Sequence, residues 1–343
     1  MHQFLNTLYV TTEGAYLHLD HDTLKVEVEK ETKLQVPVHH LGGVVCFGNV
    51  MVSPAAMARC AEDGRFFVLL DRNGRFKARV EGPVSGNVLL RSAQHEAMRD
   101  EAKTLKIAKN MVAGKIQNSR QIILRGARES KDEDDGNTLK KTTDALANSL
   151  SRLSRCENLD QVRGIEGESA RSYFSCFDRM VRENRETFQL DGRNRRPPRD
   201  PMNALLSFLY ALLMNDCVSG VEGVGLDPQM GFLHAVRPGR AALALDLMEE
   251  VRSILADRLA LTLINRRQIR KTHFIDRPGG AVHLDDDGRK EVVIAYQKRK
   301  QEEITHPLLN QKMPLGLIPH VQARLLARSL RGDMAAYIPY LYR

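Results

Sequence analysis

The stretch Gly231 to Arg252, GFLHAVRPGRAALALDLMEEVR, decides how we expect the rest of the chain to be arranged. It places His234 before a Pro238-Gly239 turn, and an Ala- and Leu-rich run then continues without glycine or proline to about Ile264. Such a run predicts a long helix. One face of that helix is apolar at about 100° per residue, so we expect this face to be buried. Its members are Leu243, Leu247, Met248, Val251, Ile254 and Leu255.

The opposite side of this helix carries the acids Asp246, Glu249, Glu250 and Asp257 beside small residues. Asp246 and Glu250 form a like-charge i,i+4 pair, which destabilises a helix by a few tenths of a kcal/mol. One interpretation is that the acids leave room for a cation. The other is that they complement the helix dipole and that Glu249 pairs with Arg252. The helix by itself does not decide between the two.

Composition indicates a soluble chain that binds a polyanion. The 343 residues are enough for two domains, and the net charge of +8 with a pI near 9.3 favours nucleic acid or an anionic membrane surface. The longest apolar run, Ala204 to Met214, is too short to span a membrane, and no signal-peptide pattern opens the chain. We therefore expect a cytoplasmic protein. Its five cysteines lack a C-x-x-C pair and are expected to be reduced core thiols.

Short extended segments dominate the N-terminal part, from Leu5 to about Glu81. Apolar residues alternate with Lys and Glu from Leu24 to Val28, which predicts a strand with one solvated face. Continuous apolar runs predict central strands at 44–47 and 66–70, the latter joined to 76–80 by an Asn-Gly hairpin turn. Ser53 and Pro54 predict a short helix to Cys60. The pattern indicates a small, mainly antiparallel β domain.

From Val88 onward the patterns are helical, and we place the domain boundary at about residues 86 to 92. The predicted fold class is α+β, with a small N-terminal antiparallel β domain (1–88) followed by a larger, all-α or nearly all-α C-terminal domain (89–343). An acidic, solvated loop is expected at Glu129–Asn137, and a small hairpin or loop at Gly279–Gly288. The other predicted helices are Val88–Gly114, Thr138–Arg155, Pro201–Val218, Arg289–Thr305 and Ile318–Leu330.

The segment Arg163 to Met180 predicts a helix that carries one carboxylate, Glu166, on its apolar side. A carboxylate in that position must be neutralised, hydrogen-bonded or bound to a cation, because burying it unpaired costs several kcal/mol. The alternative is that Glu166 lies in the first turn and caps its own helix.

Arginine clusters supply candidate phosphate contacts, although such runs are usually solvated linkers. One cluster surrounds Pro197-Pro198, and another follows the acidic helix, where helix-dipole complementarity explains part of it. The candidates for DNA binding are Arg193, Arg195, Arg196, Arg237, Arg240, Arg266 and Arg267.

Glu166, His234 and one or more of Asp246, Glu249 and Glu250 make a mixed carboxylate and imidazole set. Oxygen-rich ligands with one imidazole suit Mg²⁺ or Mn²⁺ better than structural zinc. In a basic protein, the matching substrate is a phosphodiester. No G-x-S-x-G elbow, P-loop or dinucleotide fingerprint occurs. A non-catalytic DNA-binding scaffold with a structural acidic strip is the alternative.

Several ordered motifs resemble the Cas1 family, the CRISPR-associated integrases that acquire spacers. These are GIEGESARSYF (164–174), NALLSFLY (203–210), GFLH (231–234) and DLMEE (246–250). The resemblance implies that Glu166, His234 and Glu249 bind the metal, that Asp246 supports them, and that Glu250 is a helper or a bystander. It also implies a dimerising β domain, a helical catalytic domain, homodimers and a small bridging partner, Cas2. The implied reaction is attack of a DNA 3′-hydroxyl on a phosphodiester at the repeat boundary of a CRISPR array.

Overall fold

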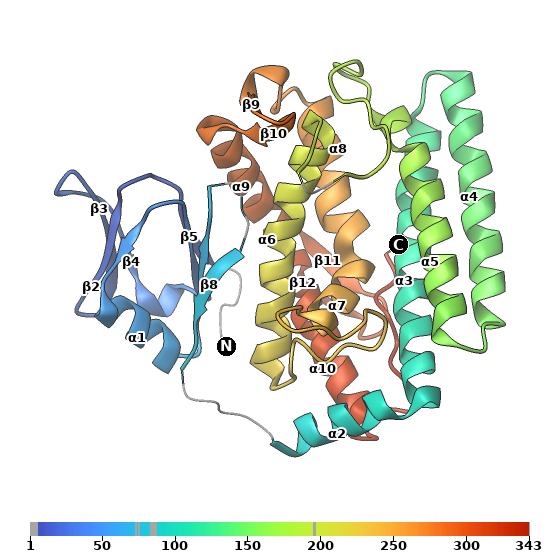
Figure 1. Cartoon of the computed structure of the whole chain (residues 1–343), viewed down its shortest axis with the longest axis horizontal. Coiled ribbons are helices and arrows are strands. Elements are labelled where there is room, and N and C mark those ends of the chain that lie inside the picture. The colour runs from blue at the N-terminus through green and yellow to red at the C-terminus, as the bar shows by residue number, and fades with distance from the viewer. Residues whose placement is uncertain (1–5, 73, 75, 83–87, 195–196, 343) are drawn as a thin grey trace.

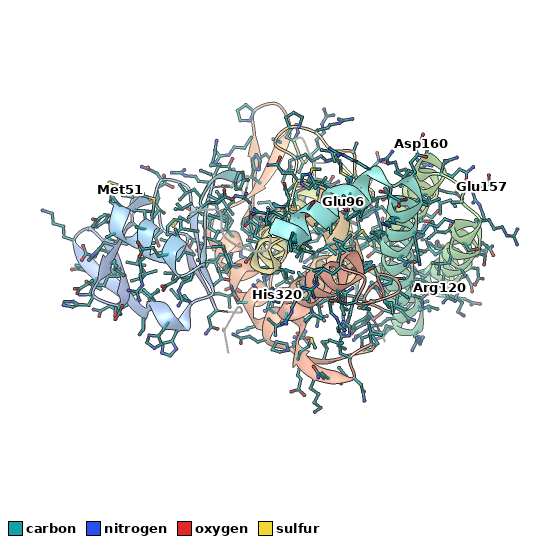
Figure 2. The ribbon with its side chains drawn as sticks, turned by 90° about the horizontal axis from the view of Figure 1, so that it is seen from below. Met51, Glu96, Arg120, Glu157, Asp160 and His320 are labelled. Carbon is teal, nitrogen blue, oxygen red and sulfur yellow. The ribbon has the colours of Figure 1, made fainter. Side chains whose placement is uncertain are left out.

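A computed structural model describes residues 6–72, 74, 76–82, 88–194 and 197–342. An N-terminal β unit lies beside a larger helical part (Figure 1). Met51 on the β unit and Glu157 in the helical part mark opposite ends of the long axis (Figure 2). This order of a β part followed by a mostly helical part confirms the predicted fold class.

The β unit contains two four-stranded sheets in the described residues, with orders β1-β5-β7-β8 and β4-β3-β2-β6. The predicted alternation is confirmed in β3, where Leu24 and Val26 are buried, and the predicted cap is confirmed where Ser53 Oγ accepts a hydrogen bond from Ala56 N at 3.2 Å. The elements are β1 (Thr7–Val10), β2 (Tyr16–Asp20), β3 (Thr23–Val28), β4 (Glu31–Pro37), β5 (Gly43–Phe47), β6 (Met51–Val52), α1 (Pro54–Glu62), β7 (Phe66–Leu70) and β8 (Phe76–Val80).

The expectation of mainly antiparallel pairing is wrong in part. The hairpin pair β7–β8 is antiparallel as predicted, although Asn73 of its turn lies outside the described residues. The pairs β1–β5, β5–β7 and β2–β6 are parallel. Between β5 and β7 the chain crosses over through β6 and α1, and a crossover of that kind returns the next strand in the same direction.

One sheet shares its core with the helices. Val45, Phe47, Val68 and Leu70 belong to the same buried cluster as the helical core, and the rings of Phe47 and Phe208 lie 5.7 Å apart. The predicted domain boundary, at about residues 86 to 92, overlaps the start of α2, and residues 83–87 before this helix lie outside the described residues. The division into two domains stays a prediction.

The helical part is built on α3, which packs against α4, α5 and α7, while α6 packs against α7 and α10. Its helices are α2 (Val88–Arg99), α3 (Glu101–Glu129), α4 (Glu133–Ser154), α5 (Leu159–Ser175), α6 (Pro201–Val224), α7 (Ala242–Arg252), α8 (Arg258–Asn265), α9 (Asp286–Gln301) and α10 (Ile318–Leu330). A π-helical turn, Ser253–Asp257, joins α7 to α8, so the long helix predicted from Ala241 is continuous. The short hairpins β9–β10 (Phe274–Arg277, Ala281–Leu284) and β11–β12 (Glu303–His306, Gln311–Pro314) complete it.

The prediction of a single helix from Val88 to Gly114 is wrong. The structure has two helices in this region, and the second one extends beyond Gly114. The chain breaks at Asp100, whose carboxylate caps α3 by accepting a hydrogen bond from Lys103 N at 3.0 Å. The helix α3 then continues through Gly114 to Glu129. Gly114 is a point of close packing, because a Cβ atom there would lie 2.8 Å from Pro339 Cβ. By sequence rules, a glycine at this position indicates the end of a helix. Here the helix continues, and glycine is needed because the segment around Pro339 leaves no room for a side chain.

The predicted end of α6 at Val218 is also wrong, for a similar reason. A Cβ atom on Gly220 would lie 3.0 Å from His320 N of α10, so this glycine permits close helix packing. The helix ends instead at Val224 and is capped by Gly225, which has φ 89°. By length and composition alone α6 could cross a membrane, yet it packs in the protein interior as a core helix.

Two acidic segments begin helices: Glu129–Asn137, predicted as a loop, and the end of Gly279–Gly288, predicted as a hairpin or loop. The hairpin is confirmed, since Gly279 and Gly280 lie between the antiparallel strands β9 and β10. Asp132 caps α4 and Asp285 caps α9, and each accepts a hydrogen bond from a main-chain N–H three residues later. Acids in a first turn complement the helix dipole, which explains their concentration there. The helix predicted from Arg289 to Thr305 gives way to β11 after Gln301, so the C-terminal part is nearly, not entirely, helical.

Candidate metal-binding site

The acids of α7 lie in the protein interior. Asp246, Glu249 and Glu250 are buried, and so is Asp257 in the π-helical turn. The helix packs on α3, α6 and α10 and has no wide solvated face. The Glu249–Arg252 pair predicted by the alternative interpretation does form, but it forms inside the protein. A solvated acidic strip is therefore excluded.

Asp246 holds the segment 231–234 against α7. Its Oδ2 atom accepts hydrogen bonds from Phe232 N at 2.6 Å and Leu233 N at 3.0 Å, and its Oδ1 atom accepts one from His234 N at 2.9 Å. Gly231 is needed at this contact, since a Cβ atom on it would lie 2.7 Å from the carbonyl carbon of Ala242. One carboxylate thus fixes the loop that carries the histidine.

The ring of His234 is oriented by the same carboxylate. His234 Nδ1 lies 2.7 Å from Asp246 Oδ1, and His234 Nε2 lies 3.9 Å from Glu249 Oε1. With the proton on Nδ1, Nε2 presents its lone pair toward Glu249. In many metal sites a histidine binds the metal through one ring nitrogen and donates a hydrogen bond to a carboxylate from the other nitrogen. The ring of His234 is oriented in the same way.

Glu166 and Glu249 meet at the ammonium group of Lys115. Lys115 Nζ forms an ion pair with Glu166 Oε1 and lies 2.7 Å from Glu249 Oε2. The three side chains come from α3, α5 and α7. The alternative in which Glu166 caps its own helix is wrong, because α5 begins at Leu159 and Asn158 is its cap.

Glu249 is ionised despite its burial. Burial by itself would raise the pKa of this carboxyl group, but the positive charges of Arg252 and Lys115, with a smaller contribution from the nearby imidazole of His234, outweigh it and lower the pKa to about 2. Arg252 pairs with the Oε1 atom of Glu249, and Lys115 faces the Oε2 atom. The carboxylate is therefore available at neutral pH as a ligand for a cation.

A second polar layer supports Arg252. Its guanidinium lies 4.9 Å from the ring centre of Tyr210, a cation–π distance. The hydroxyls of Tyr210 and Tyr173 donate to the two oxygens of Asp257 at 2.6 and 3.0 Å. Burial raises the pKa of Asp257, although these hydrogen bonds and Arg252 oppose the shift. The π-helical turn brings this fourth acid beneath the site.

Glu250 does not face Lys115 but contacts α10 and the C-terminal segment. It accepts hydrogen bonds from Gln322 Nε2 at 3.0 Å and Tyr340 N at 2.9 Å, and from the hydroxyl of Tyr337. Asn118 binds the same C-terminal segment by donating to Tyr340 O at 2.8 Å. Glu250 therefore anchors the C-terminal segment across α3 and α7.

The donor set at Lys115 fits a divalent cation. Two carboxylate oxygens, one from Glu166 and one from Glu249, converge on the positive charge of Lys115. His234 Nε2 lies 3.9 Å from the other oxygen of Glu249. In the described residues, the candidate ligand atoms of Glu166, His234 and Glu249 do not all lie within 4.8 Å of one another. A metal bound by all three would require side-chain movements, including movement of Lys115.

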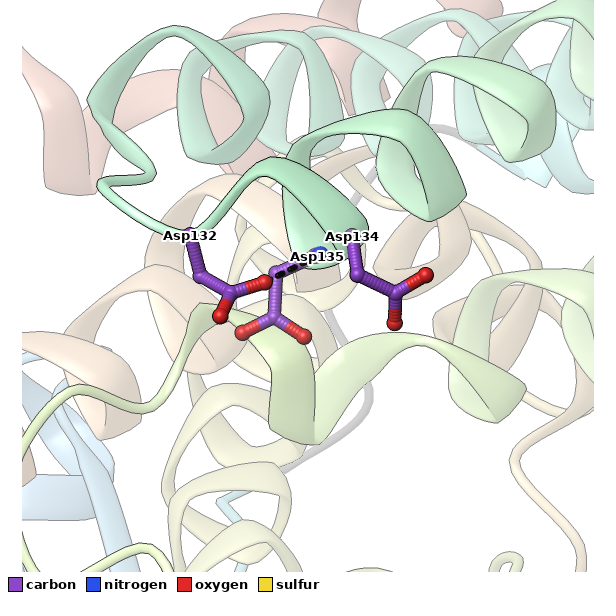
Figure 3. A group of neighbouring side chains, drawn as sticks. All are labelled: Asp132, Asp134 and Asp135. Atoms are coloured by element: carbon purple, nitrogen blue, oxygen red, sulfur yellow. Dashed lines mark hydrogen bonds between the residues drawn. The ribbon is translucent and has the colours of Figure 1, made fainter.

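A tighter acidic group lies elsewhere, at the start of α4. Ligand atoms of Asp132, Asp134 and Asp135 lie within 4.8 Å of one another (Figure 3). Arg185 donates to both oxygens of Asp135, at 2.7 and 3.0 Å, and Arg179 donates at 2.8 Å. Asp132 caps the helix. Ion pairs and helix capping thus explain this group.

The structure places the candidate DNA-binding arginines differently from one another. Arg193 is directed inward, where it is bonded to Asn203 and lies 5.2 Å from the ring centre of Tyr210. Arg237 and Arg266 are exposed, Arg240 is half-buried, and exposed Arg267 pairs with Glu183 at 2.6 Å. Arg195 and Arg196 lie outside the described residues. DNA contact by each of these arginines stays a prediction.

Lys115, Arg252 and Tyr173 are site residues that the sequence patterns did not assign to the site. A signal for Lys115 is present: it is the one charged residue in Val112–Ile116, VAGKI, a run otherwise apolar. The prediction ended the helix at Gly114, so Lys115 was not placed on any face of a helix and was not connected with the site.

Fold and site together define a class: a helical protein with a partly buried carboxylate and imidazole centre, joined to an N-terminal β unit. Residues 8–298 match the family described as CRISPR associated protein Cas1. The CRISPR-associated endonuclease Cas1 1 of Moorella thermoacetica is 64% identical over 343 residues, which is 100% of both chains.

Solved structures agree with this match. The fold is similar to that of a CAS1 protein from Thermotoga maritima, with a TM-score of 0.82 and 25% identity, covering 95% of this chain and 97% of that one. It is also similar to a casposase bound to integration product, with a TM-score of 0.83 and 21% identity, covering 97% and 92%. The chain belongs to the Cas1 family of CRISPR-associated proteins. The relatives' names, CRISPR-associated endonucleases, agree with the predicted functional class.

Proposed function

We propose that this protein binds Mg²⁺ or Mn²⁺ through Glu166, His234 and Glu249 and uses the ion to cut and join DNA. The observation that carries the proposal is the convergence of Glu166 and Glu249 on the ammonium group of Lys115, while His234 Nε2 lies 3.9 Å from the other oxygen of Glu249. A bound ion of this kind neutralises charge on a phosphodiester and orients the attacking oxygen.

The chain's own residues prepare that centre. Asp246 keeps the His234 ring turned with Nε2 toward Glu249, and Arg252 keeps Glu249 ionised from the buried side. In strand transfer, the 3′-hydroxyl of a DNA fragment gives up its proton to solvent as its oxygen forms a new bond to phosphorus. The old P–O bond breaks, and the departing 3′-oxygen takes up a proton. With water as the attacking group, the same geometry gives cleavage.

The proposed substrates are DNA fragments and the repeats of a CRISPR array, into which the fragments are inserted as new spacers. The net charge of +8 suits a polyanion, and Arg237 and Arg266 are exposed arginines that can reach phosphate. We further propose a homodimer formed through the β unit, bridging by the small partner Cas2, and a location in the cytoplasm of a prokaryote.

The metal assignment is tested with Glu166→Gln and Glu249→Gln, which keep side-chain shape and remove charge. We expect Mn²⁺ affinity, DNA cleavage and strand transfer each to fall by at least the ~100-fold that changes around metal ligands can produce. The matched control is Asp132→Asn with Asp134→Asn, which removes two exposed acids from the group in Figure 3 and should leave all three unchanged. Full activity in both glutamine variants would leave the DNA-binding scaffold as the better function.

The DNA-binding arginines are tested by salt dependence. Arg237→Gln and Arg266→Gln should each weaken DNA binding and reduce the slope of log K against log salt by about 1 for each phosphate that the arginine neutralises. Arg152→Gln is the control, because Arg152 is engaged with Glu168 at 2.7 Å. An unchanged slope in the first two variants would show that these arginines do not contact phosphate.

A further inference from the structure

We propose that Lys115 is a stand-in cation: its ammonium group holds Glu166 and Glu249 together before a metal binds, and the metal displaces it. This inference rests on the proposed function and assigns a positioning role to a residue outside the ligand set. The ammonium pairs with both carboxylates at once, and its side chain is 12% exposed while that of Glu249 is 4% exposed. The position is therefore a largely enclosed cation site formed by two acidic ligands.

The backbone beneath Lys115 is held in place. Gly114 packs against Pro339, and Asn118 is bound to Glu250 O at 2.7 Å and to Tyr340 O at 2.8 Å. Lys115 thus starts from a rigid part of α3. Its four-carbon side chain has free torsions, so the ammonium can leave its position while the helix stays.

For electrostatic reasons, either the ammonium group of Lys115 or a divalent ion can occupy the position between Glu166 and Glu249, but not both. Without a cation between them, Glu166 and Glu249 would repel each other across the gap that Lys115 now fills. Arg252 compensates Glu249 from its other oxygen but has no ion pair with Glu166 in the described residues. A divalent ion in the same place would repel the ammonium, so binding of the ion must move Lys115 outward.

This mechanism differs from a purely structural salt bridge in its consequence for the metal. Removal of a structural cross-link would loosen the site and weaken metal binding. Removal of a competing cation destabilises the metal-free protein and strengthens metal binding. A single Mn²⁺ titration therefore distinguishes the two roles, because removal of Lys115 weakens Mn²⁺ binding in the first case and strengthens it in the second.

The experiment compares Lys115→Met, Lys115→Arg and wild type as full-length proteins. Mn²⁺ affinity is measured by isothermal titration calorimetry, and thermal stability is measured with EDTA and with saturating Mn²⁺. For Lys115→Met we expect a lower Tm in EDTA, a Mn²⁺ Kd reduced by about tenfold, and a larger rise in Tm on adding Mn²⁺. Lys115→Arg keeps the positive charge and should restore the Tm in EDTA without tightening the Kd.

Lys103→Met is the matched control, since it removes a lysine from an exposed position on the same helix. It should leave the Kd and both Tm values unchanged. If wild type binds Mn²⁺ and Lys115→Met binds it equally or more weakly, the stand-in role is overturned while the metal site stands. If wild type binds no Mn²⁺ that depends on Glu166 and Glu249, the proposed function and this inference both fall.

Discussion

Asp246 Oδ1 contacts both the main chain and the ring of a single residue, His234, at 2.9 Å from its N atom and 2.7 Å from Nδ1. The other oxygen accepts the main-chain N–H groups of Phe232 and Leu233. This one carboxylate therefore joins the loop to α7 and sets the direction of the imidazole. Its role follows from geometry and does not require contact with a metal.

Asp246→Asn should weaken metal binding without removing a ligand. The amide would turn an N–H donor toward groups that donate, so the ring of His234 would lose its fixed orientation. We expect Mn²⁺ affinity to fall by about 10- to 100-fold and stability to fall by about 1–3 kcal/mol. Calorimetric titration and urea denaturation measure the two effects. The exposed Asp287→Asn is the control, and an unchanged Kd for Asp246→Asn would show that the ring needs no such partner.

Arg252→Met should be strongly destabilising. It leaves the buried carboxylate of Glu249 with only part of its compensating charge, and breaking a buried ion pair costs about 3–5 kcal/mol. Arg152→Met removes the same kind of residue from the exposed pair with Glu168, and should cost less than about 1 kcal/mol. Urea denaturation of both variants checks the contrast. Equal losses would mean that the buried pair contributes no more than a surface pair.

Gly114→Ala and Gly164→Ala should have opposite effects. A Cβ atom at position 114 would lie 2.8 Å from Pro339 Cβ and 3.2 Å from Glu250 Cγ, whereas nothing lies within 4 Å of one at position 164. We expect a loss of about 1–3 kcal/mol for the first and a gain of up to about 1 kcal/mol for the second, from helix propensity. Thermal and urea unfolding give the sign. Stabilisation by Gly114→Ala would show that the C-terminal segment can move away.

Stability should depend on pH through Glu222, which pairs with Arg79 between α6 and the strand β8. Burial raises the pKa of Glu222 from 4.5 to about 7, and the charge of Arg79 only partly opposes this. Between these pH values the folded state binds more protons than the unfolded state. The contribution is therefore fully present in acid and is lost as pH rises toward 7.

Glu222→Gln removes this titration. Denaturation of both proteins at pH 5, 6, 7 and 8 (from about two units below the folded pKa to about one unit above it) should show the variant gaining stability relative to wild type as pH rises. A difference that stays constant across the series would place the pKa of Glu222 near its ordinary value. The comparison with wild type cancels the titration of other groups.

Local pattern was sufficient for much of the fold. The alternation at Leu24 and Val26, the cap at Ser53 and the helix Ile318–Leu330 each depend on neighbours within a few residues, and all three are confirmed. Where a residue serves a distant segment, the same rules were wrong. Gly114 and Gly220 resemble helix ends in sequence, but Pro339 and His320 are what require them.

The candidate site divides in the same way. Sequence by itself predicted a β part followed by helices, and a mixed set of Glu166, His234 and one or more of Asp246, Glu249 and Glu250, because residue type and short spacing carry that information. The choice of Glu249 as a ligand with Asp246 as its support rests on the resemblance to the Cas1 motifs. Only the tertiary structure decided that Lys115 stands between Glu166 and Glu249 and that Glu250 is bound to the C-terminal segment. Those partners are 51 and 90 residues apart in the chain, so their pairing depends on how helices pack, which no local period encodes.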